Sequence, residues 1–199
     1  TWRKSASELW TSEAGHTFGG SGGTVGKHGV AIILNSRLKA KLQSFTAISN
    51  RLAYVDFSSK GFRFRVVAVY MPTNNSKYSE EYITSIYEQI SSLVEDGRKQ
   101  RRIILIAGDL NARVGKKLQA EDNRVLGSFG FGNRNTRGQQ LVDWALLNRM
   151  SIANTQFQKR PELQWTYFHA EDRSQLDYVL HEWCQKQNCF DAGTSDDIM

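Results

Sequence analysis

Ile103-Ile104-Leu105-Ile106-Ala107-Gly108-Asp109-Leu110-Asn111 is the stretch on which the fold assignment depends. Its first five residues are apolar and rich in β-branched side chains, and they are too few for a helix, so they predict a strand buried on both faces. Asp109 and Asn111 follow two residues apart and would point the same way in a pleated backbone. Layered α/β proteins bind ligands at such strand ends. Gly, Asp and Asn also favour plain turns, so a site and a simple turn both fit this stretch.

The composition describes an ordinary globular chain. The 199 residues suit a single domain spanning 1–199, and 40% hydrophobic with 23% charged residues exclude a disordered or membrane-embedded protein. No run approaches the roughly 18 apolar residues of a membrane span. Two cysteines, Cys184 and Cys189, are too few for a disulfide framework or a zinc site, which favours a reducing, nuclear or cytoplasmic location. A net charge of +6 is compatible with a polyanionic partner without proving one.

Hydrophobic periodicity predicts strands that alternate with two helices. Ser79 is a suitable N-cap for the first helix and Gly97 a suitable stop. The glycine-rich start of the chain is expected to lack regular structure, either as a linker or as a functional loop. The expected elements are strands at 29–34, within 45–57, 62–70 and 103–107, a helix at 79–98, a polar loop at 115–136, a helix at 139–150, and short strands at 151–154, 164–169 and 175–181. This mixture predicts an α/β protein with mixed sheets flanked by helices.

Polar groups occur at strand ends in four places. These are Tyr70-Met71-Pro72, Asp109-Leu110-Asn111, Trp165-Thr166, and the segment from Ser174 to Leu180, which reads Ser-Gln-Leu-Asp-Tyr-Val-Leu. In the last segment Asp177 lies on the face opposite Tyr178 and its apolar neighbours. An ionised carboxylate in an apolar strand is costly unless it is paired, so Asp177 is either half of a structural salt bridge or a functional group.

These four pieces, in this order and spacing, resemble the endonuclease/exonuclease/phosphatase superfamily from about Gly29 to Leu180. The resemblance implies a four-layered α/β sandwich of the DNase I-like type, with mixed β-sheets flanked by helices, and cleavage of phosphoester bonds with a divalent metal, usually Mg²⁺ and possible with Mn²⁺. Arg137-Gly138-x-x-Leu141 and the segment 148–155 further resemble the endonuclease domains of non-LTR (LINE-like) retrotransposons, including craniofacial development protein 2-like proteins.

The resemblance implies a role for each motif residue. Asp109 would position or deprotonate the attacking water and contribute to metal binding, and Asn111 would hold the water or the scissile phosphate. Tyr70 would donate a hydrogen bond to the phosphate in the transition state, and Asp177 would orient a catalytic histidine. Each role suits phosphodiester hydrolysis, which needs a proton acceptor for water and donors or a metal for the phosphate.

The implied substrate is duplex DNA lying across the strand ends. Trp165 and Thr166 would pack against the site and brace it. Cationic side chains in and beside the 115–137 loop would contact phosphates: Arg113, Lys116, Lys117, Arg124, Arg134 and Arg137. Such contacts position DNA without specifying sequence, so the target sequence cannot be derived from them.

Two motifs of the resembled family fall outside the match. A metal-binding Glu would immediately precede Thr1, because Glu8 and Glu13 lack a strand context, and Asp197 stands where the family has the His of Ser-Asp-His. We therefore expect a chain truncated at both ends that nicks DNA poorly as given, and a longer polypeptide that could carry a reverse transcriptase domain. A monomer is expected. The alternatives are a phosphatase or lipid phosphodiesterase on the same fold, and an inactive remnant that binds nucleic acid or protein.

Overall fold

The computed structural model describes residues 6–23, 28–73, 77–169 and 172–194. Thr1, and Asp197 in the expected position of the histidine, lie outside these ranges. The chain forms two compact units that are interleaved in sequence. The first unit contains residues 1–71 and 92–108, and the second contains 72–91 and 109–199.

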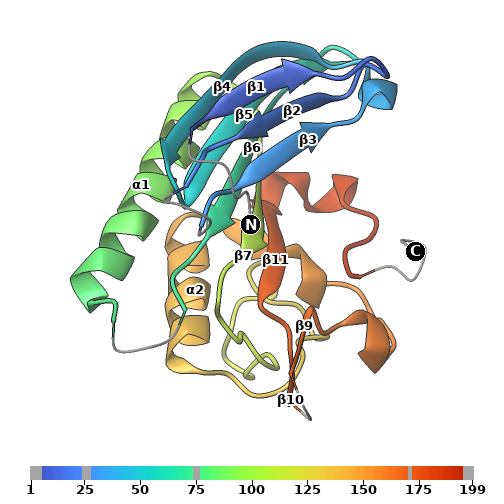
Figure 1. Ribbon diagram of the computed structural model, residues 1–199. Helices are drawn as coiled ribbons and strands as arrows, with labels where there is room; N and C mark the ends of the chain where they lie inside the picture. The colour runs from blue at the N-terminus through green and yellow to red at the C-terminus, as the bar shows by residue number, and fades with distance from the viewer. Residues whose placement is uncertain (1–5, 24–27, 74–76, 170–171, 195–199) are drawn as a thin grey trace. The chain divides into compact units, whose positions relative to one another are not determined.

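The first unit is built on two sheets (Figure 1). The smaller sheet is antiparallel and contains β1 (Glu8–Thr11), β2 (Thr17–Gly20) and β3 (Ala31–Leu34). A short 3₁₀ turn, Ser36–Leu38, follows. The strands of the larger sheet in this unit follow the order β4 (Lys41–Ser49), β5 (Leu52–Ser59), β6 (Phe62–Tyr70) and β7 (Ile103–Asp109). The predicted strands at 45–57 and 62–70 are confirmed by β4, β5 and β6.

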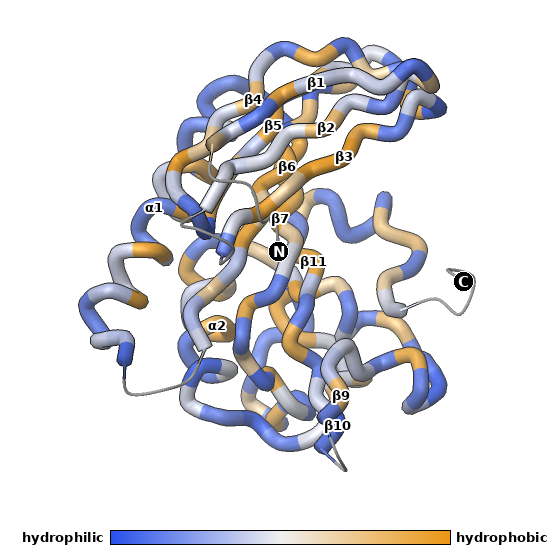
Figure 2. Tube along the Cα trace, viewed as in Figure 1, coloured by the Kyte–Doolittle hydropathy of each residue, from blue (hydrophilic) through white to orange (hydrophobic). Residues whose placement is uncertain are grey.

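The core of the first unit lies between these sheets. Ile32 and Leu34 point from β3 toward Val55 and Phe57 of β5, and all four side chains are buried. The intervening Ile33 is 58% exposed, so β3 is buried on one face only. Figure 2 shows the corresponding hydrophobic colouring along β3 and β6.

The hairpin β1–β2 corrects the expectation that the first 27 residues lack regular structure. Trp10 and Phe18 face each other across the hairpin, and their rings stack with centroids 4.2 Å apart. Position 19 in β2 requires a glycine, because a Cβ atom there would lie 2.5 Å from the ring of Phe45. The glycines that suggest a loop in the sequence therefore permit close packing of a strand, and Glu8 does have a strand context.

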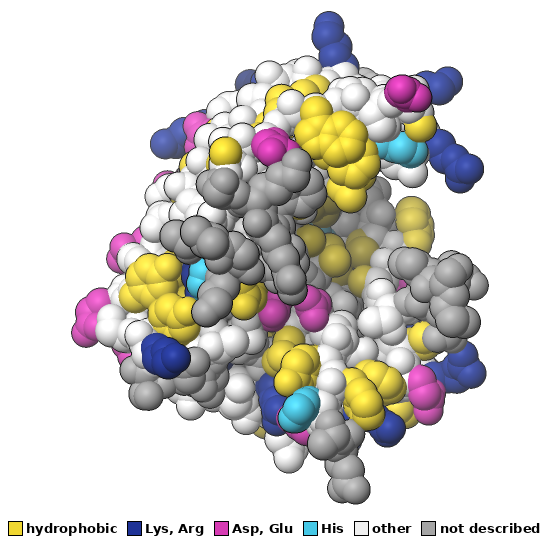
Figure 3. Space-filling model, viewed as in Figure 1, with side chains coloured by type: hydrophobic (Ala, Val, Ile, Leu, Met, Phe, Trp, Pro, Cys, Tyr) yellow, Lys and Arg dark blue, Asp and Glu magenta, His cyan; other side chains and the backbone are white. Residues whose placement is uncertain are grey.

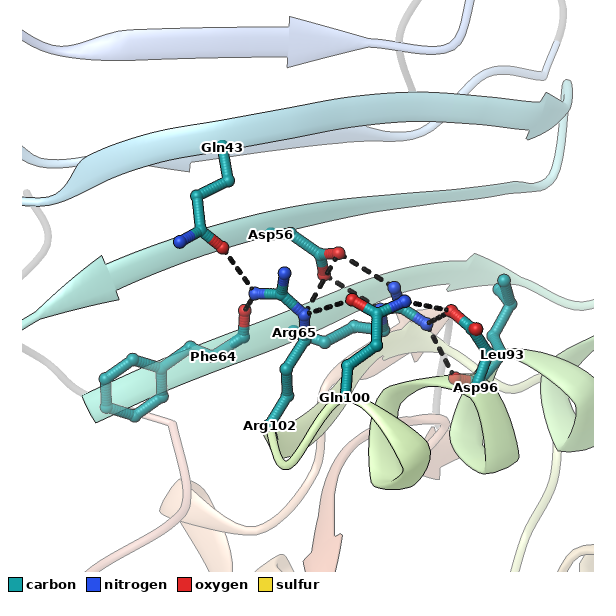
Figure 4. Close-up of polar contacts among 8 residues, drawn as sticks. All are labelled: Gln43, Asp56, Phe64, Arg65, Leu93, Asp96, Gln100 and Arg102. Carbon is teal, nitrogen blue, oxygen red and sulfur yellow. Dashed lines mark hydrogen bonds and ion pairs between the residues drawn. The ribbon is translucent and has the colours of Figure 1, made fainter.

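A network of buried charges joins β5, β6 and the end of the first helix (Figure 4). Arg65 is 1% exposed and binds both carboxylate oxygens of Asp56, with its Nε and Nη2 each 2.8 Å away. Its Nη1 donates to Asp96 at 2.7 Å, and Nε of Arg102 lies 3.2 Å from Asp56. The hydrogen bond to Asp56 is the main cause that raises the pKa of Arg65. Arg65 is therefore a core residue of β6 together with Val67 and Val69, which are also buried.

Helix α1 (Glu80–Lys99) begins where the sequence predicts, with Ser79 Oγ accepting from the N–H of Tyr82 at 3.2 Å. It does not stop at Gly97. The helix ends through Arg101, whose φ is +56°, with the Arg102 N–H bonded to the Gly97 carbonyl at 3.0 Å in the pattern of a Schellman motif. Gly97 instead admits Ile104, whose Cδ1 would lie 3.1 Å from an added Cβ.

The second unit contains α2 (Thr136–Leu147), β8 (Met150–Ile152), β9 (Tyr167–His169), β10 (Asp172–Ser174) and β11 (Asp177–Glu182). Short 3₁₀ turns occupy Ala153–Thr155, Pro161–Leu163 and Trp183–Asn188. Strand β8 pairs antiparallel with β11, and β9 with β10, a strand that periodicity alone does not reveal. None of the helices in the described ranges is both long enough and apolar enough to cross a membrane.

Candidate active site

The segment after β7 is a turn that also presents a carboxylate. Asn111 has a φ of +46°, and its N–H donates to Oδ1 of Asp109 at 2.9 Å. The pleated alternation predicted to carry through Asn111 therefore ends at Asp109. The plain-turn interpretation describes the backbone correctly, and the turn fixes one oxygen of the carboxylate against its own backbone.

Asp109 and Asp177 are close enough to influence each other's charge. The pKa of Asp109 is raised from 3.8 to about 6. Burial is the largest cause and the negative charge of Asp177 adds to it, while the hydrogen bond from the Asn111 N–H acts in the opposite direction. Asp177 is half-buried, and it has no ion-pair partner within the described ranges. The structural salt bridge considered for Asp177 is therefore not formed there.

Backbone hydrogen bonds hold these two carboxylates in register. The N–H of Leu110 donates to the carbonyl of Leu176 at 2.9 Å. Thr166 Oγ1 accepts from the N–H groups of Leu176 and Asp177, at 3.0 and 3.1 Å. A single hydroxyl thus accepts from two successive N–H groups at the start of β11, and the bracing role expected for Thr166 stays a prediction.

The hydroxyl of Tyr178 forms a second connection between β11 and the segment after Asp109, and the sequence pattern does not reveal it. Its hydroxyl donates to the Gln175 carbonyl at 2.7 Å and accepts from the Val114 N–H at 3.3 Å. The side chain is 2% exposed, and burial raises the pKa of the phenol well above its usual range. It reads as an apolar core position in the sequence, because a Tyr hydroxyl that bonds two backbone groups leaves no signal in the spacing.

Trp165 packs beside the hairpin β9–β10. Its ring centroid lies 5.9 Å from that of Phe168, and the guanidinium of Arg173 sits 5.1 Å from the Trp165 ring centroid. Phe168 is 57% exposed. Trp165 thus anchors an exposed aromatic hairpin, while its predicted contact with substrate stays a prediction.

Tyr70 lies in the first unit, at the end of β6. The Arg51 guanidinium sits 4.8 Å from the centroid of its ring and donates to its carbonyl at 3.1 Å, while the Tyr70 N–H donates to the Arg51 carbonyl at 2.9 Å. Asp109, Asn111 and Asp177 lie in the second unit. The predicted convergence of Tyr70 with those three side chains stays a prediction.

The basic side chains differ in their availability. Arg137 has a 6% exposed side chain that donates to Gln140 at 3.1 Å and lies 3.4 Å from Glu80. Arg134 is paired with Glu121, and both are largely buried. Arg124 is bonded to Asp122 at 2.6 Å and Arg113 to Asp172 at 2.5 Å, both at the surface, and Lys116 is exposed.

Figure 3 shows separate Lys and Arg side chains projecting around the strands at the top of the view. Any DNA contact by Arg134 or Arg137 would require breaking the ion pairs described above. Their predicted phosphate contacts stay predictions, whereas Lys116 and Arg113 are exposed as such contacts require.

No family model matches the chain. Its sequence is similar to craniofacial development protein 2 of Tragulus javanicus and of Bos taurus, each 33% identical over 156 residues, or 77% of this chain. The aligned region makes up 26% and 25% of these relatives, so the chain spans about a quarter of their length.

Solved structures share its fold. The endonuclease domain of TRAS1, a telomere-specific non-LTR retrotransposon, aligns with a TM-score of 0.54 and 16% identity over 88% of this chain and 67% of that one. The 3′-5′ exonuclease NExo of Neisseria meningitidis aligns with a TM-score of 0.56 and 14% identity, covering 82% and 66%. An AP endonuclease of Archaeoglobus fulgidus gives 0.54 and 13%, covering 84% and 66%. The resemblance predicted from the motifs is therefore confirmed: this chain has the DNase I-like α/β fold of the endonuclease/exonuclease/phosphatase superfamily and is similar in sequence to craniofacial development protein 2.

Proposed function

We propose that this chain is a nuclease domain that hydrolyses phosphodiester bonds of DNA with a divalent metal, and that it derives from a retrotransposon endonuclease. The observation that carries the proposal is the carboxylate pair of Asp109 and Asp177 at the ends of two strands, with a pKa of about 6 for Asp109. Perturbed carboxylates coupled to a second charge are typical of catalytic sites.

Asp109 has the properties of a general base. A proton acceptor works best when its pKa lies near the operating pH, and a carboxyl group with a pKa of about 6 is mostly ionised at pH 7 and still basic enough to accept a proton from water. The Asn111 N–H donates to Oδ1 of Asp109 at 2.9 Å. This bond fixes the orientation of the carboxylate and so restricts the direction in which Oδ2 can accept a proton. Asn111 is the residue proposed to hold the water or the phosphate.

The donor set suits a hard divalent cation. Mg²⁺ is usually held by one or two carboxylates together with substrate phosphates, and Asp109 and Asp177 supply two carboxylates. A cation beside them would also offset their mutual repulsion. The described ranges contain no group of three or more His, Cys, Asp or Glu residues that could hold a metal. Asp109 would therefore supply only part of the ligand set, and Mn²⁺ would take the same oxygens as Mg²⁺. A bound metal would polarise the phosphate and stabilise its transition-state charge.

The proposal of DNA as substrate rests on relatives and on charge. TRAS1 is a retrotransposon endonuclease, and NExo has been solved bound to a product DNA hairpin. The net charge of +6, the exposed Lys116 and the partly exposed Arg113, which is paired with Asp172, favour a polyanion. The curated relatives are about four times longer than the aligned region, which leaves room for the proposed reverse transcriptase domain in a full-length product.

A nicking assay tests the proposal. Supercoiled plasmid is incubated with the 199-residue chain and with the full-length gene product, in Mg²⁺, in Mn²⁺ and in EDTA. We expect little metal-dependent conversion to open circles by the 199-residue chain and much more by the full-length product. Asp109→Asn should abolish this conversion, because the amide cannot accept the proton of water. The matched control is Asp143→Asn, at an exposed residue of α2 whose carboxylate accepts a hydrogen bond from Gln139 at 2.8 Å.

Duplex binding, measured by fluorescence anisotropy, separates the alternatives. Asp109→Asn should bind DNA at least as tightly as the parent, because it removes a negative charge. Tight DNA binding without nicking in either protein would favour an inactive nucleic-acid-binding remnant. Hydrolysis of a phosphomonoester or a phospholipid instead of DNA would favour the phosphatase or lipid phosphodiesterase. Nicking at the parent rate by Asp109→Asn would place the chemistry elsewhere.

A further inference from the structure

Asn135 connects the start of α2 to the segment that follows the Asp109 turn. Its Oδ1 accepts from the Gly138 N–H at 2.8 Å, which is an N-cap, and from the Arg113 N–H at 3.1 Å. Its own N–H donates to the Arg113 carbonyl at 3.1 Å. A helix cap needs only the first of these bonds. The other two satisfy both backbone groups of a residue 22 positions earlier in the chain.

The packing of Gly138 shows independently that this junction is tight. A Cβ atom at Gly138 would lie 1.8 Å from the carbonyl oxygen of Arg113. The first turn of α2 therefore rests directly on the backbone at Arg113, and the cap residue is bonded to that same peptide. Two features of α2 thus converge on one residue of the preceding segment.

Residues 110–135 contain no helix or strand, apart from an isolated bridge at Leu126. The course of the chain after Asp109 therefore depends on a few specific bonds instead of a regular ladder. Leu110 is tied to Leu176, Val114 to Tyr178, and Arg113, between them, to Asn135. Asn111, in its left-handed conformation, lies between the bond at Leu110 and the bonds at Arg113 and Val114.

We propose that Asn135 is a positioning residue for the candidate active site: the cap of α2 also sets the backbone from Asp109 to Val114, and thereby the direction of the Asp109 carboxylate and of the Arg113 side chain. This inference rests on the proposed function for its catalytic consequence. Its structural content, that the Asn111 turn depends on Asn135, is independent of any activity.

Two substitutions separate capping from positioning. Ser is as good an N-cap as Asn, but its oxygen lies about one bond length closer to the backbone, so Asn135→Ser should keep the bond to Gly138 and lose the one to Arg113. Asn135→Asp keeps an acceptor in the position of Oδ1 and should keep both. Ser79→Ala removes the cap of α1 without touching Arg113 and controls for loss of a cap alone.

Hydrogen exchange of individual amides, followed by NMR, provides the readout that does not need activity. In Asn135→Ser we expect exchange at least about tenfold faster at Arg113 and at Asn111, with Gly138 unchanged, and parental rates in Asn135→Asp. Faster exchange confined to Arg113, with the Asn111 amide still protected by Asp109, would overturn the proposal, because the turn would then hold itself.

Nicking kinetics test the catalytic consequence. In Asn135→Ser we expect kcat to fall about tenfold or more with KM nearly unchanged, since small displacements of a catalytic group cost large factors in rate. Asn135→Asp should restore kcat, and Ser79→Ala should leave it intact. A parental kcat in Asn135→Ser would overturn the positioning role. A parent that does not nick in either metal would defeat the proposed function, while the exchange at Asn111 would still decide whether Asn135 positions the turn.

Discussion

The N–H of Leu110 donates to the carbonyl of Leu176 at 2.9 Å, and this bond joins the residue after Asp109 to the residue before Asp177. Two carboxylates are thereby brought near each other by backbone contacts, and neither forms an ion pair within the described ranges. The like-charge repulsion is part of the native fold, and it contributes to the raised pKa of Asp109. Such a site stores unfavourable free energy that a bound cation can release.

Replacing Asp109 by Asn should stabilise the protein at neutral pH. Folding raises the pKa of Asp109 from 3.8 to about 6, so the folded state binds the proton more tightly and the parent loses stability as the pH rises through that interval. Asn carries no charge to bury. We expect Asp109→Asn to exceed the parent by on the order of 1 to 2 kcal/mol at pH 7.5 and to match it at pH 3.5, in urea unfolding. The exposed control Asp143→Asn should match the parent at both values, and a less stable Asp109→Asn at pH 7.5 would contradict the burial argument.

The two carboxylates that bind Arg65 should differ in their importance. The side chain of Asp56 is 5% exposed and that of Asp96 is 54% exposed. Asp56→Ala removes the acceptor of Arg65 Nε and Nη2 inside the core and should cost about 3 to 5 kcal/mol in the free energy of unfolding. Asp96→Ala breaks a solvent-screened pair and should cost less than about 1 kcal/mol. Equal losses from the two variants, measured by urea unfolding, would show that burial does not determine the strength of this network.

Gly108 should not tolerate a side chain. Its φ is +142°, a conformation that side chains rarely adopt, and an added Cβ would lie 2.0 Å from the Val69 carbonyl oxygen. We expect Gly108→Ala to cost more than about 2 kcal/mol. Gly132 also has a positive φ, +68°, but nothing lies within 4 Å of its added Cβ, so Gly132→Ala should cost only about 1 kcal/mol. Thermal unfolding of both variants measures the difference, which should vanish if the close approach at Val69 is unimportant.

Lys116 and Arg137 should affect DNA binding differently. Lys116→Met removes an exposed cation and should weaken duplex binding while reducing the slope of log K against log salt by about 0.9. Arg137→Met removes a buried side chain bonded to Gln140 and should lower stability by about 1 to 2 kcal/mol with no change in the salt slope. Anisotropy titrations between low and moderate salt distinguish the two. A reduced slope for Arg137→Met would restore the phosphate contact predicted from the sequence.

Elements with a clear hydrophobic period could be predicted from the sequence, and others could not. The alternation of residues 62–70 and the helical period after Ser79 match β6 and α1 to within a residue. The sequence does not reveal the hairpin β1–β2, because Gly19 is required by packing against Phe45, a contact distant in sequence. Gly97 was taken for a helix stop for the same reason, since its true partner is Ile104.

The candidate site also contains residues that a local sequence pattern reveals and residues that depend on contacts distant in sequence. Asp109 stands out in the sequence because it follows an apolar strand. The role of Asp177 in the same site was predicted only from the family resemblance. Asn135 acts through two hydrogen bonds to the backbone of Arg113, and Tyr178 through one to the backbone of Val114. No local pattern marks such bonds, because their partners are decided by how the chain returns on itself.

The pairing of Asp56 with Arg65 has a consequence for how the β5–β6 hairpin finds its alignment. The two residues are direct cross-strand partners, and the turn between the strands, at Lys60 and Gly61, has positive φ at both positions, as a two-residue type I′ turn requires. A slip of either strand would bury an unpaired guanidinium opposite an uncharged neighbour, at a cost of several kcal/mol. Both the turn geometry and the cross-strand ion pair therefore disfavour any other register of this hairpin. The register of β6 against β5 therefore fixes the position along the sheet at which β6 ends, at Tyr70.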